Sequence, residues 1–209
     1  MSNVRKNTLS TKRMVLASIL TALIIVMSFT PLGYLKIGTV EITFLPIPVA
    51  VGAIILGPWW GLFFGTVFGV TSFLQCFGMS VFGTALMGVN PVYTFILCLV
   101  PRLLVGFLTG LIYKLFCKFD KKRFFAVSVS AVMAAIINTL FFTVLFVIFF
   151  CNADLSGNES LPLNFSQMTI MELVLLIVTV NSIVEIIACG AFGAAISKTL
   201  AAFVPEFSK

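Results

Sequence analysis

The sequence predicts an all-α membrane protein with six transmembrane helices, on the basis of its composition, the lengths of its apolar segments and its charge distribution. Hydrophobic residues make up 60% of the 209 residues, charged residues only 10%, and the mean hydropathy is +1.18. A typical soluble domain carries about 25% charged residues, so the solvent of this chain must be lipid. A span takes roughly 20 residues, which leaves no room for a separate soluble domain beside six of them. We therefore expect residues 1–209 to form a single integral-membrane domain.

Six apolar segments follow one another along the chain with short connections between them. The second segment is the weakest, because it starts with Pro46 and Pro48 and stops at the Gly57-Pro58 breaker. It is either short and tilted or partly re-entrant, and in the latter case the number of spans would be five. The first segment follows basic residues but has no cleavage site before Pro31, so we expect a retained helix. The expected spans are 14–29, 46–56, 59–77, 92–116, 124–150 and 168 to about 201.

The positive charges orient these spans, because cytoplasmic loops of membrane proteins carry an excess of Lys and Arg. With six spans, nearly all basic residues fall on one side, and both termini are predicted to be cytoplasmic. The opposite side has few charges, among them Lys36, Glu41, Asp154 and Glu159, and an uncharged connection over 78–89. Five spans fit this pattern less well. The basic residues on the cytoplasmic side are Arg5, Lys6, Lys12, Arg13, Lys114, Lys118, Lys121, Lys122, Arg123, Lys198 and Lys209.

Several function classes are disfavoured by what the sequence contains. Positive-inside topology accounts for the net charge of +6, so no nucleic-acid partner is expected. The chain has no histidine and no G-x-x-x-x-G-K-[ST] loop, so we expect neither catalysis nor ATP hydrolysis by this chain, and no cofactor. The cysteines are odd in number, scattered and mostly within apolar runs, which indicates buried thiols rather than a structural disulfide or metal site. They are Cys76, Cys98, Cys117, Cys151 and Cys189.

Four polar side chains fall near the middle of apolar segments: Arg102, Asn138, Asn181 and Glu185. An ionisable group at the bilayer centre costs roughly 2.5–3.5 kcal/mol on insertion scales, so it persists mainly beside a partner, a water-filled cavity or a ligand. Counted at about 1.5 Å per residue, the four side chains can meet in one layer. Arg102 and Glu185 then form a buried ion pair with the asparagines as hydrogen-bond partners, or Arg102 binds the carboxylate of an anionic ligand.

Shallower binding candidates lie at the outer ends of two expected spans. Loop 33–44 alternates short polar and β-branched residues between prolines, so it could close over a ligand as a lid, or be a solvated connector. The polar residues at these outer span ends are candidates for ligand contact. Hydrogen bonding to water and lipid headgroups is the alternative role for each of them. They are Gln75, Asn90, Tyr93 and Thr94.

Small residues recur every four positions, which lets helix backbones approach closely. Gly61, Gly65 and Gly69 repeat in this way and most simply serve internal packing. In the first helix the two pairs Ala17-x-x-x-Thr21 and Ser18-x-x-x-Ala22 occupy adjoining strips.

The run from Ile47 to Gly61, with Gly65-x-x-x-Gly69-x-Thr71-Ser72 after it, resembles the substrate-binding (S) component of energy-coupling factor (ECF) vitamin transporters. The likeness extends to Pro101-Arg102 with Gly106, to Asn138-Thr139, and to Asn181 with Glu185. It implies a six-helix protein of the cell membrane that binds a vitamin from outside and topples on a membrane scaffold (T) subunit driven by two cytoplasmic ATPases. It also implies that the small-residue strip of the first helix docks the scaffold, with the register left open by the two pairs.

Within this family the pattern Ile-Pro-Val followed by Gly-Ala-Ile-Ile-Leu-Gly-Pro is most similar to pantothenate-type members, and a buried arginine suits the carboxylate of pantothenate. Pyridoxine, riboflavin and folate remain open as ligands. Two other readings also remain, a stand-alone small transporter that needs no ATPase and a structural membrane protein without a ligand.

Overall fold

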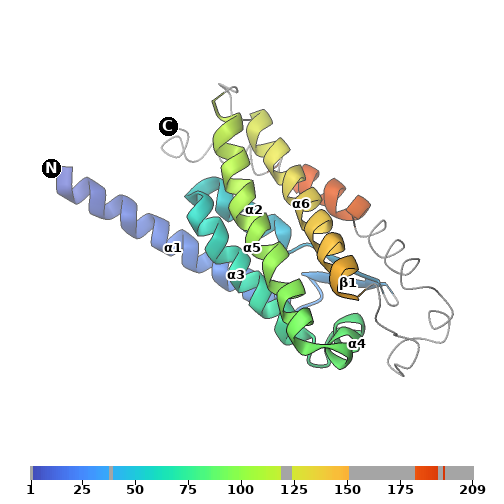
Figure 1. The fold of residues 1–209 in the computed structure, drawn as a ribbon. Helices are drawn as coiled ribbons and strands as arrows, with labels where there is room; N and C mark the ends of the chain where they lie inside the picture. The colour runs from blue at the N-terminus through green and yellow to red at the C-terminus, as the bar shows by residue number, and fades with distance from the viewer. Residues whose placement is uncertain (1, 38–39, 119–123, 151–181, 193–194, 196–209) are drawn as a thin grey trace.

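The protein is a helical bundle with one short hairpin, seen in a computed structural model that describes residues 2–37, 40–118, 124–150, 182–192 and 195 (Figure 1). The predicted helical class is confirmed for these residues. The helices are α1 (Ser2–Ser28), α2 (Pro46–Leu56), α3 (Pro58–Gln75), α4 (Val81–Val89), α5 (Pro91–Phe116) and α6 (Phe124–Phe150), followed by an unlabelled helix over Ser182–Phe192; the strands are β1 (Tyr34–Ile37) and β2 (Val40–Thr43).

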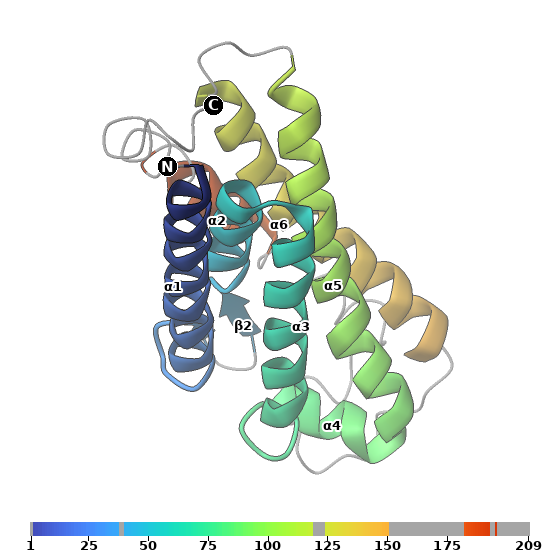
Figure 2. The same cartoon turned by 90° about the vertical axis from the view of Figure 1, so that its left-hand side faces the viewer.

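Close contact between α3 and α5 forms the centre of the bundle (Figure 2). The two backbones touch where glycines face each other, since a Cβ on Gly61 would overlap the carbonyl oxygen of Gly106 and a Cβ on Gly106 would overlap that of Gly61. One turn along α3, Gly65 packs in the same way against the backbone of Arg102. The glycine repeat therefore packs α3 against α5, and this contact sets the position of Arg102 along the axis of the bundle.

The connection between α1 and α2 is a two-stranded antiparallel hairpin, with Tyr34 opposite Thr43 and Ile37 opposite Val40. Its alternating β-branched residues suit an extended backbone. The hairpin gives the expected lid segment a defined structure, while its closing over a ligand stays a prediction.

The uncharged connection 78–89 contains a short helix that was not predicted, because Val81–Val89 forms α4. The hydroxyl of Ser80 accepts a hydrogen bond of 3.1 Å from the backbone nitrogen of Gly83 and caps the helix N-terminus. At about 1.5 Å per residue, a helix of nine residues is too short to cross a bilayer. The length of its apolar segment therefore did not indicate a helix. In Figure 2, α4 lies across the ends of α3 and α5.

Three helices in the described part of the chain are long and apolar enough to cross a membrane: Thr11–Ser28, Pro91–Phe116 and Phe125–Phe150. The segment expected to be weakest, α2, has only 11 residues. At about 1.5 Å per residue, its length is about half the thickness of the hydrocarbon core. It ends at Gly57, whose φ of 102° allows α3 to begin at Pro58 without a connecting loop. Six spans with cytoplasmic termini remain a prediction.

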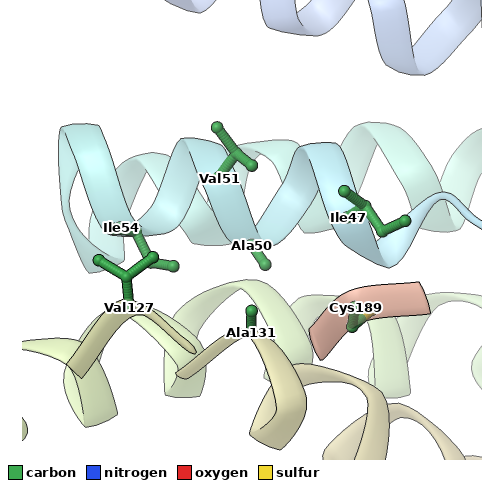
Figure 3. A pocket seen from close by; sticks show the side chains of 7 residues that line it. All are labelled: Ile47, Ala50, Val51, Ile54, Val127, Ala131 and Cys189. Atoms are coloured by element: carbon green, nitrogen blue, oxygen red, sulfur yellow. The ribbon is translucent and has the colours of Figure 1, made fainter. Parts of the chain in front are cut away.

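The seam where α2 meets α6 and the Ser182–Phe192 helix is packed with small and branched side chains (Figure 3). Its cavity has a volume of only about 10 Å³, far too small for a vitamin. This seam therefore holds the last described helix in the bundle and does not bind a ligand of that size. It is lined by Ile47, Ala50, Val51, Ile54, Val127, Ala131 and Cys189.

Candidate functional site

The structure brings together two of the polar residues that the sequence places in mid-membrane. Asn138 on α6 donates a hydrogen bond of 2.9 Å from Nδ2 to Oε1 of Glu185 on the Ser182–Phe192 helix. Both side chains are buried, and Glu185 is 1% exposed. Beside them, Ser182 donates a 3.3 Å hydrogen bond to the hydroxyl of Thr139, so polar contacts join the two helices at two neighbouring positions. Asn181 lies outside the described residues.

Arg102 is held in place by its own helix and by aromatic rings. Pro101 has no backbone N–H and so leaves the carbonyl oxygen of Leu97, four residues earlier, without its helical donor. Nη1 of Arg102 donates to that oxygen at 3.1 Å. The guanidinium carbon lies 5.4 Å from the centre of the Phe68 ring and 5.1 Å from that of Phe142. Cation–π attraction to rings of α3 and α6 thus stabilises the charge of Arg102.

Three buried polar atoms of this region have no hydrogen-bond partner among the described residues: Nε of Arg102, Oδ1 of Asn138 and Oε2 of Glu185. One is a donor and two are acceptors. Arg102 also acts electrostatically on the Glu185 carboxyl, although no hydrogen bond joins the two side chains in the described part of the chain. Buried groups of this kind are normally paired, so the cluster has spare capacity for a polar ligand, water or a rearranged Arg102.

The candidates at the start of α5 have local structural contacts. Oδ1 of Asn90 accepts hydrogen bonds from the backbone nitrogens of Val92 at 3.0 Å and Tyr93 at 3.3 Å, and so caps α5. The Thr94 hydroxyl donates to the Asn90 carbonyl oxygen at 2.9 Å. Tyr93 stacks on Phe149 of α6 with ring centres 4.9 Å apart. These contacts explain the presence of all three residues without a ligand, and their role in binding stays a prediction.

Gln75 has a different position, because it lines a cavity of about 430 Å³ at the end of the bundle that carries the hairpin. Its Nε2 donates to the backbone oxygen of Ser28 at the end of α1. The cavity is partly open to the surface, and part of its wall is formed by polar side chains. It is lined by Ser28, Phe29, Thr30, Pro31, Tyr34, Gln75 and Met79.

The wall of this cavity is fixed by hydrogen bonds between α1, β1 and α3. The Ser28 hydroxyl donates to Oγ1 of Thr71 at 2.9 Å, and the Tyr34 hydroxyl lies 3.0 Å from Oγ of Ser72. Ser28, Thr30 and Tyr34 were not among the predicted site residues. Their signal was present in the sequence, since polar residues follow the apolar run of the first helix at the start of the expected lid.

The two small-residue strips of α1 face different surroundings. Ala17 is 4% exposed and packs in the core, and Thr21 is half-buried with its hydroxyl bonded to the Ala17 carbonyl oxygen at 2.8 Å. Ser18 and Ala22 are both exposed. Within the described residues, the Ser18–Ala22 strip is therefore the one open to a partner.

Comparisons with known proteins identify the family. The family described as "ECF transporter, substrate-specific component" matches residues 12–196. Over 200 residues the chain is 30% identical to a protein of Leuconostoc mesenteroides subsp. mesenteroides named pantothenate transporter PanT, and the match covers 91% of this chain and 92% of that protein. With its apolar helices, the chain is a multi-pass protein of the cell membrane, and it belongs to the family of substrate-specific components of ECF transporters.

Proposed function

We propose that this chain is the subunit of an ECF-type importer that binds pantothenate. The cavity beside Gln75 carries this proposal, because its volume of about 430 Å³ lies in the range of roughly 300–1,000 Å³ typical of small-molecule sites. Its polar groups come from three elements, which suits a ligand with hydroxyl, amide and carboxylate groups. The name of the Leuconostoc relative supports pantothenate in particular.

A second hollow of similar volume, about 450 Å³, lies between α1 and α2 and fits this ligand less well. Its wall is almost entirely apolar, so a polar vitamin would lose its hydrogen bonds to water there without replacement. It is lined by Leu20, Leu23, Met27, Leu32, Phe44, Ile47, Pro48, Val51 and Phe192.

Arg102 is proposed as the partner of the ligand carboxylate. Its guanidinium lies beside Phe68, seven residues before Gln75 on α3, which corresponds to about 10 Å along the helix. The free donor on Nε and the lack of a bonded carboxylate partner among the described residues favour this role over a purely structural ion pair. Asn138, Asn181 and Glu185 are proposed to complete the polar layer.

Energy for import is proposed to come from two ATPase subunits in trans through a membrane scaffold subunit, because the sequence has no phosphate-binding loop of its own. Docking of the scaffold is assigned to Ser18 and Ala22 on the exposed strip of α1. We further propose that residues 1–209 form a single domain with six spans and cytoplasmic termini. Uptake in cells that lack the scaffold and ATPases would instead identify a stand-alone transporter.

Thermal unfolding of the purified chain against a vitamin panel tests the ligand. A ligand at 100 times its Kd adds about 2.7 kcal/mol to stability, so the true vitamin raises Tm selectively. We expect pantothenate to do so. If only pyridoxine, riboflavin or folate raises Tm, that vitamin is the ligand in place of pantothenate. If no vitamin raises Tm, the proposal that the chain is a vitamin-binding subunit is wrong.

A further inference from the structure

Two cysteine side chains from different helical elements meet near the polar cavity. Sγ of Cys76 lies 3.8 Å from Sγ of Cys98, and both residues are buried, at 5% and 7% exposure. Cys76 is the C-cap of α3, directly after the cavity residue Gln75, whereas Cys98 lies in α5. A contact across 22 positions of the chain means that a bond between them would join the two central helices.

The surrounding packing holds both thiols in this position. The Cys98 backbone is pressed against Gly69 of α3, where an added Cβ would lie 3.1 Å from the Cys98 carbonyl oxygen. Cys76 donates a hydrogen bond of 3.4 Å to the carbonyl oxygen of Ser72, and Gly83 of α4 leaves room for its sulfur, since a Cβ there would come within 2.7 Å. A disulfide has an S–S distance of about 2.05 Å, so the two sulfurs would have to move about 1.8 Å closer for a bond to form.

We propose that Cys76 and Cys98 are a redox-active dithiol that hydrogen peroxide converts to a reversible disulfide between α3 and α5. Both thiols are buried to a similar extent, and Cys76 is taken as the attacking thiol because it lies at the end of α3 next to the exposed residues Phe77 to Met79. The inference refines the expectation of buried thiols: the pair is reduced at rest and oxidisable, and it is not a permanent structural bridge.

The chemistry needs only the peroxide and the two thiols. The Cys76 sulfur attacks one peroxide oxygen, the O–O bond breaks, and the departing hydroxide takes the thiol proton to form water. The Cys98 sulfur then attacks the resulting sulfenic sulfur, the S–S bond forms, and the sulfenic hydroxyl leaves with the Cys98 proton as a second water. The two thiols lose two electrons in total, and the peroxide gains them.

The disulfide would act on the cavity through Gln75. A covalent bond at the next residue fixes the end of α3 to α5 and removes the S–H donor to Ser72, whose own hydroxyl contacts Tyr34 in the cavity wall. We therefore expect oxidation to slow pantothenate exchange. This consequence rests on the proposed function, whereas the formation of the disulfide does not.

The test uses the full chain in detergent, treated with hydrogen peroxide, denatured, and labelled on its remaining thiols with maleimide-polyethylene glycol. Wild type has five cysteines, and we expect two to become unreactive after peroxide and to recover after dithiothreitol. The variants Cys76→Ser and Cys98→Ser should each lose this reversible protection. Cys117→Ser and Cys189→Ser are matched controls that should keep it, and peptide mass spectrometry should find Cys76 joined to Cys98.

Three outcomes would overturn the proposal: all five thiols stay reactive, the protection persists in Cys76→Ser, or dithiothreitol fails to restore the thiols, which indicates overoxidation. If the disulfide forms but pantothenate exchange is unchanged, the dithiol stands and only its effect on the site is wrong. If pantothenate never binds, the thiol result still stands by itself. A thermal melt of each serine variant before oxidation checks that it is folded.

Discussion

Asn138 Nδ2 and Glu185 Oε1 lie 2.9 Å apart across 47 positions of the chain, and this hydrogen bond joins α6 to the Ser182–Phe192 helix inside an apolar bundle. The remaining oxygens of the two side chains, Oδ1 of Asn138 and Oε2 of Glu185, are buried without partners among the described residues. A contact that is half satisfied in this way stabilises the packing of the two helices and also leaves polar atoms for a ligand or water.

The first prediction concerns the strength of this contact. Truncating one side of a buried hydrogen bond costs about 1–3 kcal/mol, because the other side stays buried and unpaired. We expect Asn138→Ala and Glu185→Ala each to lower Tm in detergent, and the double variant to lose less than the sum of the two. Coupling between polar pairs in membrane bundles averages about 0.6 kcal/mol and reaches roughly 1.7 kcal/mol.

Asn138→Leu provides a comparison of similar volume, since it removes the amide without leaving a large cavity. Additive losses in the double variant would mean that Asn138 and Glu185 do not interact in the folded protein.

A second prediction follows from the contact between Gly61 and Gly106. A methyl group on either residue would overlap the backbone of the other, and overpacking costs typically about 1–3 kcal/mol or more where backbones must move. Gly106→Ala should therefore lower Tm markedly. Gly190→Ala is the control, because among the described residues its Cβ would meet only the Val132 side chain at 3.4 Å, an ordinary contact. Equal Tm values for the two variants would argue against close packing of α3 on α5.

Much of the bundle was predictable because apolar segment length and breakers mark membrane helices directly. The weak second segment ended at Gly57, as the sequence indicated, and became an 11-residue helix. The helix α4 was missed because nine residues fall below the length used to recognise a span. Its N-cap at Ser80 was a usable local signal.

The candidate site was only partly predictable from the same sequence. The cost of burying polar groups marked Arg102, Asn138 and Glu185 as side chains that need partners, and the sequence suggested an ion pair between Arg102 and Glu185. Depth along a helix does not give the direction of a side chain, so the observed pairing of Asn138 with Glu185 could not be derived. Arg102 therefore turned out to bond to Leu97 and to lie between the rings of Phe68 and Phe142. Ser28 and Tyr34 line the cavity because the end of α1 and the hairpin fold back on α3. The periodicity of apolar residues along a helix does not predict this contact.

The third prediction separates the cavity from the residues that cap α5. Gln75→Leu keeps the approximate size of the side chain but removes its polar atoms from the cavity wall, so we expect weaker pantothenate binding with a folded protein. Loss of one hydrogen bond to a neutral ligand group corresponds to about 0.5–1.5 kcal/mol, or roughly 2- to 12-fold in Kd. Isothermal titration calorimetry of the purified chain measures this change.

The matched control is Asn90→Ser, which retains a capping oxygen on α5. It should leave Kd unchanged if Asn90 serves only as a cap. A larger effect at Asn90 than at Gln75 would move the binding site from the cavity to the start of α5.

The fourth prediction concerns scaffold docking on α1. Ala22→Leu adds bulk on the exposed strip and should reduce co-purification of the scaffold and ATPases while pantothenate binding stays unchanged. Ala17→Leu is the contrasting variant, because Ala17 is buried and the added bulk should lower Tm instead. If Ala17→Leu abolishes co-purification at normal Tm and Ala22→Leu does not, the docking register is the other strip.

The last prediction assigns the ligand carboxylate to Arg102. A hydrogen bond to a charged group contributes about 1.5–3 kcal/mol, so Arg102→Ala should weaken pantothenate binding by roughly 10- to 150-fold. Arg102→Lys keeps the charge but loses the planar fork and the fit between Phe68 and Phe142, so we expect an intermediate Kd. The alcohol pantothenol, which lacks the carboxylate, is the matched ligand: it should bind wild type weakly and bind Arg102→Ala no more weakly than it binds wild type. Arg102→Ala also removes the donor to the Leu97 oxygen, so its Tm without ligand must be measured beside its affinity. Equal pantothenate affinity in the alanine and lysine variants would exclude a carboxylate contact and leave Arg102 with a structural role between α3 and α6.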